Sequence, residues 1–230
     1  MKSLKLVPLR PKILSCRMIP QVDAALAKGL GCDVKRHTSI GIVTCDQDDS
    51  LYAALDHATK FASVDVVYAK SFYAGSSHAS GPLSGEIMGV IAGSDPDEVA
   101  EGIWAIREAL KEEICFYTLD EPGKPAFFPH VISSLGRYLS AQAGLEVGQA
   151  MAYLIAPPAE SVVALDHALK SARVRMVKYF GPPTETNFGG AYLAGELTEV
   201  ETAARAFAEA VMDVAKFPLE AARRPERMRR

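Results

Sequence analysis

The sequence has few cysteines and no long apolar run, and each shortage excludes a class of protein. The four cysteines, Cys16, Cys32, Cys45 and Cys115, form no C-x-x-C pair and are too few for a disulfide scaffold. We therefore expect free thiols that are buried or half-buried. No apolar stretch approaches the roughly 20 residues that cross a bilayer, and the first 20 residues hold no signal-peptide core. These absences predict a cytoplasmic protein without a membrane partner.

Sequence motifs for common enzyme chemistry are also missing. There is no G-x-G-x-x-G after a strand, no P-loop, no H-E-x-x-H, no G-x-S-x-G and no Cys/His cluster at zinc spacing. We expect no catalytic residues, no metal and no cofactor. A formal net charge of −3 over 230 residues gives no general electrostatic reason to bind nucleic acid.

The end of the chain departs from this near-neutral balance. It carries five arginines with almost nothing apolar between them: Arg223, Arg224, Arg227, Arg229 and Arg230. Such a composition cannot bury a core, so we predict that residues 219–230 form a basic, disordered tail. The alternative is an interaction arm for RNA, an acidic partner or cargo.

An internal repeat organises the rest of the chain. The segment Ala-Leu-Asp-His-Ala-Thr-Lys at 54–60 recurs at 164–170 with six of seven residues identical, 110 positions later. The same order of elements surrounds both copies: an apolar strand, the helix, a second strand, a loop of small residues, a third strand and a long amphipathic helix. The predicted strands are 39–45, 64–68 and 86–93 in the first half and 150–156, 174–178 and 191–195 in the second.

Several helix starts can be predicted. Asp95 can cap a helix that has Pro96 at its first position, and residues 198–201 form a capping-box pattern. Asp49 or Ser50 can cap the helix of the first repeat. Each half also begins with a leader, 13–30 and 127–145, that predicts a strand followed by a helix.

Each half is therefore an α+β unit of ferredoxin-like character whose first strand and helix come in permuted order, with helices on one side of a small sheet. We expect two modest cores, in domains 1–118 and 119–218 that meet in the turn-rich segment 119–125. His57 and His167 occupy equivalent helix positions, which favours a structural or interface role for both over a ligand role.

Polar residues suited to a binding site lie in the non-helical segments. Asp46, Asp48 and Asp49 follow a strand, and Glu86 opens another strand after a glycine. The loop 71–85 is long and rich in small residues, as in mobile lids, and 181–190 is its shorter counterpart. Phe116 follows a long helix and is suited to core or interface packing.

Several of these stretches occur together, and in the same order, in a known family. They are T-x-D-x-D-D-x-x-Y (44–52), V-V-Y-x-x-S-x-Y-A-G-x-x-H (66–78), Gly85-Glu86, M-A-Y-L-I-A-P-P (151–158) and P-P-T-E-T-N (182–187). From about residue 7 to residue 218 the sequence resembles the EutL family, the tandem-domain shell proteins of ethanolamine-utilization bacterial microcompartments.

The resemblance implies two circularly permuted microcompartment domains and a homotrimer whose six domains form a pseudohexameric tile beside other shell proteins. It implies a central opening gated by loops, which here would include Phe72, Tyr73, Ala74, Gly75, Pro183, Thr184 and Glu185. It also implies ethanolamine binding in smaller pores, at the positions Asp48, Asp49, Glu86, Phe116, Thr186, Asn187 and Phe188. Carboxylates and an aromatic face suit a primary ammonium group.

The function expected on this resemblance is that of a non-catalytic wall component that controls the passage of small molecules. Two alternatives remain at this point. One is a shell protein of another microcompartment, such as one that metabolises propanediol or ethanol. The other is a small-molecule sensor, because duplicated ferredoxin-like domains with ligand loops also suit regulatory proteins.

Overall fold

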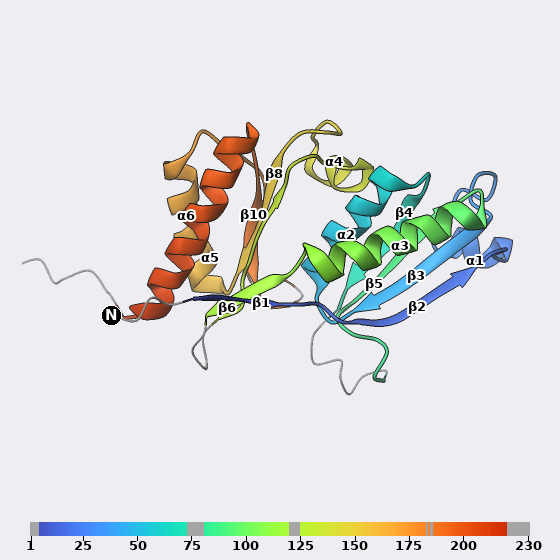
Figure 1. Ribbon diagram of the computed structural model, residues 1–230, viewed down its shortest axis with the longest axis horizontal. Helices are drawn as coiled ribbons and strands as arrows, with labels where there is room; N and C mark the ends of the chain where they lie inside the picture. The colour runs from blue at the N-terminus through green and yellow to red at the C-terminus, as the bar shows by residue number, and fades with distance from the viewer. Residues whose placement is uncertain (1–4, 73–80, 120–124, 183, 185, 220–230) are drawn as a thin grey trace, which may run out of the picture.

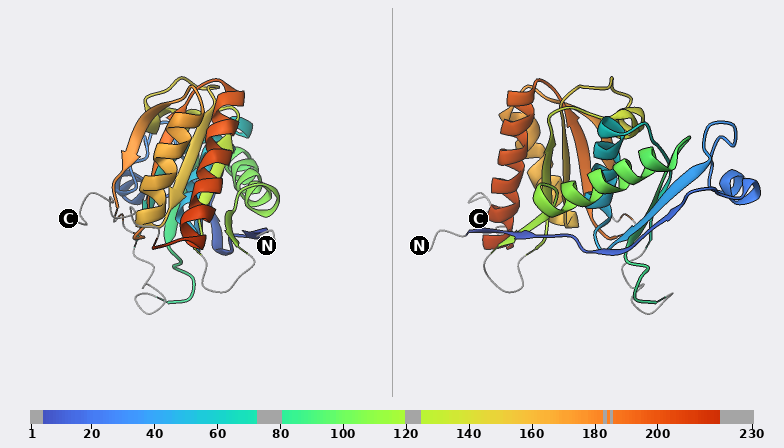
Figure 2. Two further views of the ribbon diagram at one scale, coloured as in Figure 1. Left: turned by 90° about the vertical axis from the view of Figure 1, so that its left-hand side faces the viewer. Right: turned by 45° about the vertical axis from the view of Figure 1, so that its right-hand side comes forward.

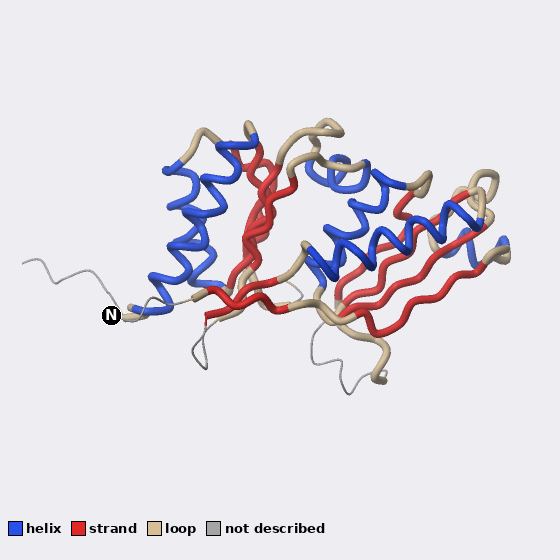
Figure 3. The backbone as a smooth tube through the Cα atoms, viewed as in Figure 1, coloured by secondary structure: helices blue, strands red, loops and turns tan. Residues whose placement is uncertain are grey.

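The computed structural model of the chain describes residues 5–72, 81–119, 125–182, 184 and 186–219. Within these residues the strands form two four-stranded antiparallel sheets and one two-stranded ribbon (Figures 1 and 3). The α+β class predicted from the sequence is confirmed. No helix of this described part is both long and apolar enough to cross a membrane.

The two sheets repeat one topology. The first has the order β2-β3-β5-β4, and the second has the order β7-β8-β10-β9. The strands of the first sheet are β2 (Ile13–Ile19), β3 (Ser39–Cys45), β4 (Asp65–Ser71) and β5 (Ile87–Gly93). Those of the second are β7 (Phe128–Ile132), β8 (Met151–Ala156), β9 (Arg175–Phe180) and β10 (Gly189–Ala194).

Helices and sheets alternate in layers along the long axis of the molecule (Figure 1). At one end α5 (Pro158–Ser171) and α6 (Leu197–Lys216) cover one face of the second sheet. The other face of that sheet turns toward α2 (Asp48–Phe61) and α3 (Pro96–Glu112), which cover the first sheet. The short helices α1 (Ala24–Gly29) and α4 (Arg137–Ala143) complete the described helices. The right-hand view of Figure 2 shows the same succession of layers, and its left-hand view looks along the long axis with α5 and α6 toward the viewer.

The distribution of buried side chains corrects the expectation of two separate cores. The described residues form three clusters of buried apolar side chains, and one of these clusters joins the two halves. It contains Leu55 and Ile106 of the first half together with Phe128, Leu139 and Tyr153 of the second. The sequence repeat did not predict this shared core. The helices and strands of the two halves have the same apolar pattern, and that pattern does not show that one half packs on the other.

Helices lie on both faces of the first sheet, so the expectation of helices on one side is also wrong. The α1 segment packs Val22 and Ala27 against Ile40 and Val90, on the face opposite α2 and α3. Several apolar residues of this face remain only half-buried: Ile19, Leu30, Ile42, Val67, Tyr68 and Met88.

A ribbon of two short strands connects the halves. β1 (Leu6–Leu9) pairs antiparallel with β6 (Phe116–Leu119), and the ribbon runs below the second half in Figure 1. Leu6 and Tyr117 pack against the cluster between the second sheet and its helices α5 and α6. Apart from Leu119, both strands belong to the predicted domain 1–118, yet they contribute to the core of the other half. The exact domain boundaries stay a prediction.

Two of the three predicted helix starts differ in the structure. Asp95 caps α3 by accepting a hydrogen bond from the Asp97 backbone N–H, as expected. Helix α2 instead begins after Gln47 without a side-chain cap, so neither Asp49 nor Ser50 has that role. Helix α6 begins after Glu196, also without a side-chain cap, so Thr198 of the expected capping box lies inside the helix and not at its cap.

The two copies of the repeated helix segment have different surroundings. Asp56 of α2 is buried and accepts hydrogen bonds from the backbone N–H groups of Gly136 (2.7 Å) and Leu139 (2.8 Å) at the start of α4. Its counterpart Asp166 is exposed and pairs with Lys170 at 2.7 Å. The histidines differ likewise, since half-buried His57 stacks on Phe61 and His167 is exposed. Equivalent residues thus make an internal contact in the first half and lie at the surface in the second.

Candidate functional site

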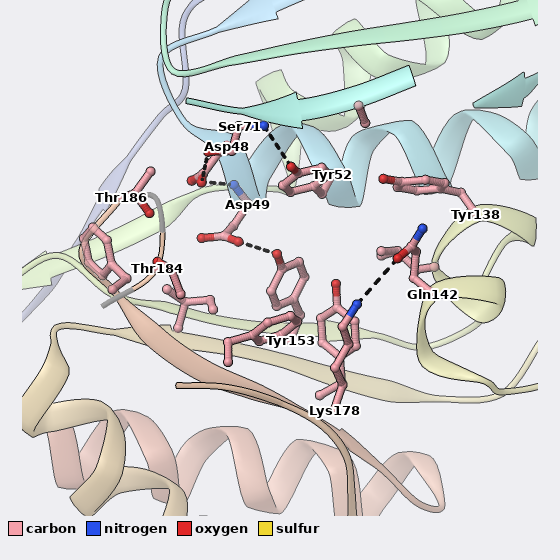
Figure 4. A pocket seen from close by; sticks show the side chains of 16 residues that line it. Asp48, Asp49, Tyr52, Ser71, Tyr138, Gln142, Tyr153, Lys178, Thr184 and Thr186 are labelled. Carbon is pink, nitrogen blue, oxygen red and sulfur yellow. Dashed lines mark hydrogen bonds between the residues drawn. The ribbon is translucent and has the colours of Figure 1, made fainter. Parts of the chain in front are cut away.

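A cavity of about 240 Å³ lies between the two halves. The first half contributes the start of α2 and the end of β4, and the second half contributes α4 and the inner face of its sheet. The lining residues are Asp48, Asp49, Tyr52, Ala69, Ser71, Tyr138, Leu139, Gln142, Tyr153, Ile155, Lys178, Phe180, Thr184, Thr186, Phe188 and Tyr192 (Figure 4). Polar groups therefore meet in this cavity from segments more than one hundred residues apart in the chain.

Two carboxylates of the first helical turn of α2 form one end of the cavity. Asp48 and Asp49 are both buried, with exposed fractions of 8% and 6%. Asp48 accepts a hydrogen bond from its neighbour's backbone N–H (2.9 Å) and another from the Ser71 hydroxyl (2.8 Å). The positive end of the helix dipole favours acidic residues at these positions, which explains why α2 can begin with two of them.

Asp49 has one side-chain partner from the other half, the hydroxyl of Tyr153, which donates a hydrogen bond to it. Burial raises the pKa of Asp49 well above its ordinary value, and the nearby charges of Asp48 and Glu86 raise it further. Burial also raises the pKa of Asp48. No described lysine or arginine forms an ion pair with either carboxylate. This end of the cavity is therefore strongly suited to a positive charge.

Glu86 lies beside this pair without lining the cavity itself. Its backbone N–H donates to the Cys45 carbonyl (2.8 Å), and its carbonyl accepts from Phe72 (2.9 Å). Burial, together with the charges of Asp48 and Asp46, raises the pKa of this half-buried carboxyl to about 7. The preceding Gly85 has φ +64°, and a Cβ there would lie 2.2 Å from the Cys45 carbonyl oxygen. Glycine is thus required for this approach of the chain.

Aromatic rings form the wall contributed by the second sheet. Tyr153 and Tyr192 meet edge to face, with ring centroids 4.6 Å apart, and Phe180 contacts Tyr192 at 4.9 Å. Phe188 also lines the cavity. Phe116 is buried behind it, with its ring 5.9 Å from that of Phe188, and does not reach the cavity.

The loop before β10 closes part of the cavity. Thr184 and Thr186 both line it, and the Thr184 backbone N–H donates to the Phe188 carbonyl (3.1 Å). Asn187, which follows Thr186, has φ +64° and is exposed outside the cavity.

The structure thus brings together four of the seven residues predicted for ligand binding, and Thr184 of the predicted gate joins them. Glu86 acts on the pair electrostatically, whereas Phe116 and Asn187 lie outside the cavity. Phe72, which was also predicted for the gate, follows β4 and donates its backbone N–H to the Glu86 carbonyl. Tyr73, Ala74, Gly75, Pro183 and Glu185 lie outside the described residues, as does the tail from 220 onward.

Sequence reasoning missed most of the cavity wall: Tyr52, Tyr138, Gln142, Tyr153, Lys178, Phe180 and Tyr192. The sequence could have indicated Tyr52, because this residue lies four positions after Asp48 and three after Asp49 and so shares their helix face. The others come from the second half, and nothing in their local pattern marks them as facing the first. Among the described residues, no group of three His, Cys, Asp or Glu side chains could hold a metal ion.

Comparison with known proteins identifies the relatives of this chain. Residues 39–120 match the model of the BMC domain family. The bacterial microcompartment shell protein EutL of Clostridium perfringens is 46% identical over 211 residues, which are 92% of this chain and 97% of that protein. EutL of Salmonella typhimurium is 40% identical over 215 residues, 93% of this chain and 97% of that protein.

Solved structures agree. The ethanolamine utilization protein EutL from Leptotrichia buccalis has a TM-score of 0.90 and 47% identity, covering 94% of this chain and all of that one. EtuB of Clostridium kluyveri has a TM-score of 0.72 at 21% identity, covering 87% of each chain, and shows a shared fold only. The other-microcompartment and sensor alternatives therefore lose their support. The relatives are named as shell proteins, as expected for a structural and non-catalytic chain. This chain belongs to the EutL family of bacterial microcompartment shell proteins.

Proposed function

We propose that the chain is a wall component of an ethanolamine-utilization microcompartment, and that the cavity between its halves binds ethanolamine. The observation that carries the binding proposal is the buried pair Asp48 and Asp49, which no described cationic side chain neutralises. Burying a charge is costly unless it is paired, so a cationic ligand would stabilise both carboxylates in their ionised form.

The surroundings of the pair suit a primary ammonium in particular. An ammonium group has three N–H donors and no acceptor, which matches the acceptor-only carboxylates. Tyr153 would keep its hydrogen bond to Asp49, and its ring and that of Tyr192 would offer electron-rich surfaces. The hydroxyl of the ligand would find polar partners in the remaining cavity wall.

Calorimetric titration with ethanolamine tests this proposal. We expect heat of binding with the wild type, at least tenfold weaker binding with Asp49→Asn, and weaker binding with Glu86→Gln, because both variants remove negative charge near the ammonium. Asp166→Asn removes the same charge from the exposed face of α5 and should bind as the wild type does. Equal binding, or none, in all four proteins would refute the site.

The cavity also provides a route from ligand binding to a gate. Thr184 and Thr186 line the cavity in the loop that follows β9, and Phe72 begins the long loop after β4 beside Glu86. We propose that both loops border the central opening of the tile, and that bound ethanolamine favours the closed gate by its higher affinity for that state. Structures of the protein with and without ethanolamine test this, and identical loop conformations in both would contradict it.

A homotrimer follows from the duplication. Inside the chain, α2 of the first half covers the inner face of the second sheet. The equivalent helix α5 exposes Val162 (52%) and Val163 (43%), and the equivalent face of the first sheet leaves Val67 and Tyr68 half-buried. We propose that α5 of one copy covers that face in the next, a head-to-tail contact that closes into a ring of three.

Light scattering coupled to size-exclusion chromatography measures this assembly. A stable trimer that associates further into sheets supports the role as a wall component beside other shell proteins. Val163→Glu would place a charge in the contact and should shift the protein toward the monomer. A wild type that remains a monomer or dimer at all concentrations would refute the proposal.

A further inference from the structure

The cavity has a positive end opposite its acidic end. Lys178 projects from β9, at the side where α4 meets the second sheet, and Tyr153 lies between it and Asp49 (Figure 4). Its Nζ atom lies 3.5 Å from Oε1 of Gln142, 5.3 Å from the ring centroid of Phe180 and 5.8 Å from that of Tyr192. The ammonium group is thus held over aromatic faces at the cavity wall.

The position of Lys178 follows from the sheet. It is the register partner of Tyr192 on the adjacent strand β10, and the register shifts immediately beyond that pair. The side chain is half-buried, so its methylene stem covers apolar surface while its charged end meets the cavity. No described Asp or Glu forms an ion pair with it. Its neighbours in the cavity at this end are the uncharged Gln142 and aromatic rings.

We propose that Lys178 determines which amines this cavity accepts. Its ammonium donates a hydrogen bond to an oxygen atom at the far end of a bound primary amine, and it excludes ligands that carry a second positive charge. The inference rests on the proposed ammonium site at Asp48 and Asp49, and it concerns the opposite end of the ligand. The ligand class is a short amine with a hydroxyl or carboxylate oxygen at its other end.

The charges explain why such selection is effective. A lysine ammonium has donors only, so a ligand oxygen satisfies it and a ligand ammonium cannot. Like charges repel more strongly in a partly buried cavity than in water, because the surrounding medium screens them less. The cavity volume of about 240 Å³ exceeds what a two-carbon ligand fills, so size alone selects weakly among short amines.

Calorimetric titration of the intact protein with matched three-carbon ligands tests the proposal. The ligands are propylamine, 3-aminopropan-1-ol and 1,3-diaminopropane, with ethanolamine as a reference. In the wild type we expect the amino alcohol to bind about tenfold more tightly than the diamine, a ratio that corresponds to 1.4 kcal/mol. Lys178→Met keeps an unbranched side chain without the charge, and Lys111→Met removes the same charge from the exposed surface of α3.

The pattern across variants separates the two proposals. We expect Lys178→Met to abolish or reverse the preference for the amino alcohol over the diamine while propylamine binding changes little, and Lys111→Met to behave as the wild type. An unchanged preference in a folded Lys178→Met overturns the inference. Absence of binding by every amine to the wild type overturns the ammonium site itself. If Lys178→Met does not fold, Lys178→Gln replaces it in the test, because glutamine retains a hydrogen-bond donor without the charge. Lys178→Gln should raise the affinity for the diamine.

Discussion

The contact between Asp56 and α4 provides a direct test of how the two halves are held together. Helix α4 begins after Gly136 and has no side-chain cap of its own. Asp56, with an exposed fraction of 0%, supplies that cap from the other half through two hydrogen bonds. Thr59 accepts a third, from the Arg137 backbone N–H, at 2.9 Å. Side chains of α2 therefore satisfy three N–H groups at the start of α4.

Replacing Asp56 by alanine leaves two N–H groups without their acceptor in a buried place. An unsatisfied buried group costs about 1–3 kcal/mol. Removing the buried carboxylate also removes its desolvation cost, which offsets part of this loss. We therefore expect Asp56→Ala to lower the free energy of unfolding by about 3 kcal/mol. Asp56→Asn, which keeps one acceptor oxygen, should lose about half as much.

The sequence repeat supplies a matched control. Asp166→Ala makes the same chemical change at the equivalent helix position, where the aspartate is exposed and pairs only with Lys170, four residues on. Such a pair contributes about 0.3–0.5 kcal/mol. Urea denaturation followed by circular dichroism, at one fixed protein concentration, gives both values. Losses for Asp56→Ala and Asp166→Ala that agree within about 0.5 kcal/mol would refute the reasoning.

Three further predictions concern the backbone and the titrating groups. Gly85→Ala should destabilise the fold by more than Gly144→Ala. Both glycines have φ +64°, but only at Gly85 does an added Cβ meet backbone atoms of Cys45. Thermal unfolding compares the two variants, and we expect a loss of about 1 kcal/mol for Gly144→Ala. The pKa of Glu86 is raised to about 7, so its ionisation destabilises the folded state as the pH rises from about 4.5 through 7. Glu86→Gln should therefore lose less stability than the wild type between pH 5 and pH 8 in urea titrations, and an identical decline would contradict this. Burial lowers the pKa of His130 to about 4. The stability that this shift gives the folded state is therefore present above pH 6.5 and is lost as the pH falls from there toward 4. His130→Gln should accordingly show a shallower loss of stability over that acidic range, and an unchanged slope would count against the assignment.

Local patterns predicted the elements of this fold well. The strand predicted at 39–45 coincides with β3, and the helix start at Asp95 and Pro96 is confirmed, because alternation of apolar residues and a capping residue act within a few positions of the chain. The capping box at 198–201 is wrong because α6 begins before it, at Leu197 after Glu196, so Thr198 lies inside the first turn and not at the cap position. In that turn Glu199 accepts hydrogen bonds from the backbone N–H of Arg173 at 2.8 Å and from its guanidinium group, a contact between distant segments that the local pattern does not show.

Local sequence patterns indicated only the acidic half of the candidate site, and Thr184, Thr186 and Phe188 were named through the family resemblance. Asp48 and Asp49 are adjacent in sequence and stood out as a pair. Their partner Tyr153 is 104 residues away, and its strand is as apolar as β3, so no local signal showed which face would meet α2. Lys178 was missed for the same reason. The packing of one half on the other determines the far end of the cavity, and the sequence of either half alone does not contain that arrangement.

The shared core has a consequence for synthesis of the chain on the ribosome. Its first-half members, from Val43 onward, are complete once Phe116 has been made, but its second-half members extend to Tyr192. At a synthesis rate of about 5–20 residues per second, the apolar surface of α2 and α3 stays exposed for roughly 4–15 s. During that interval a nascent chain exposes an apolar helical surface to the other nascent chains on the same mRNA. Cells that make this protein in quantity therefore face a stage of exposure to aggregation that two separately folding domains would avoid.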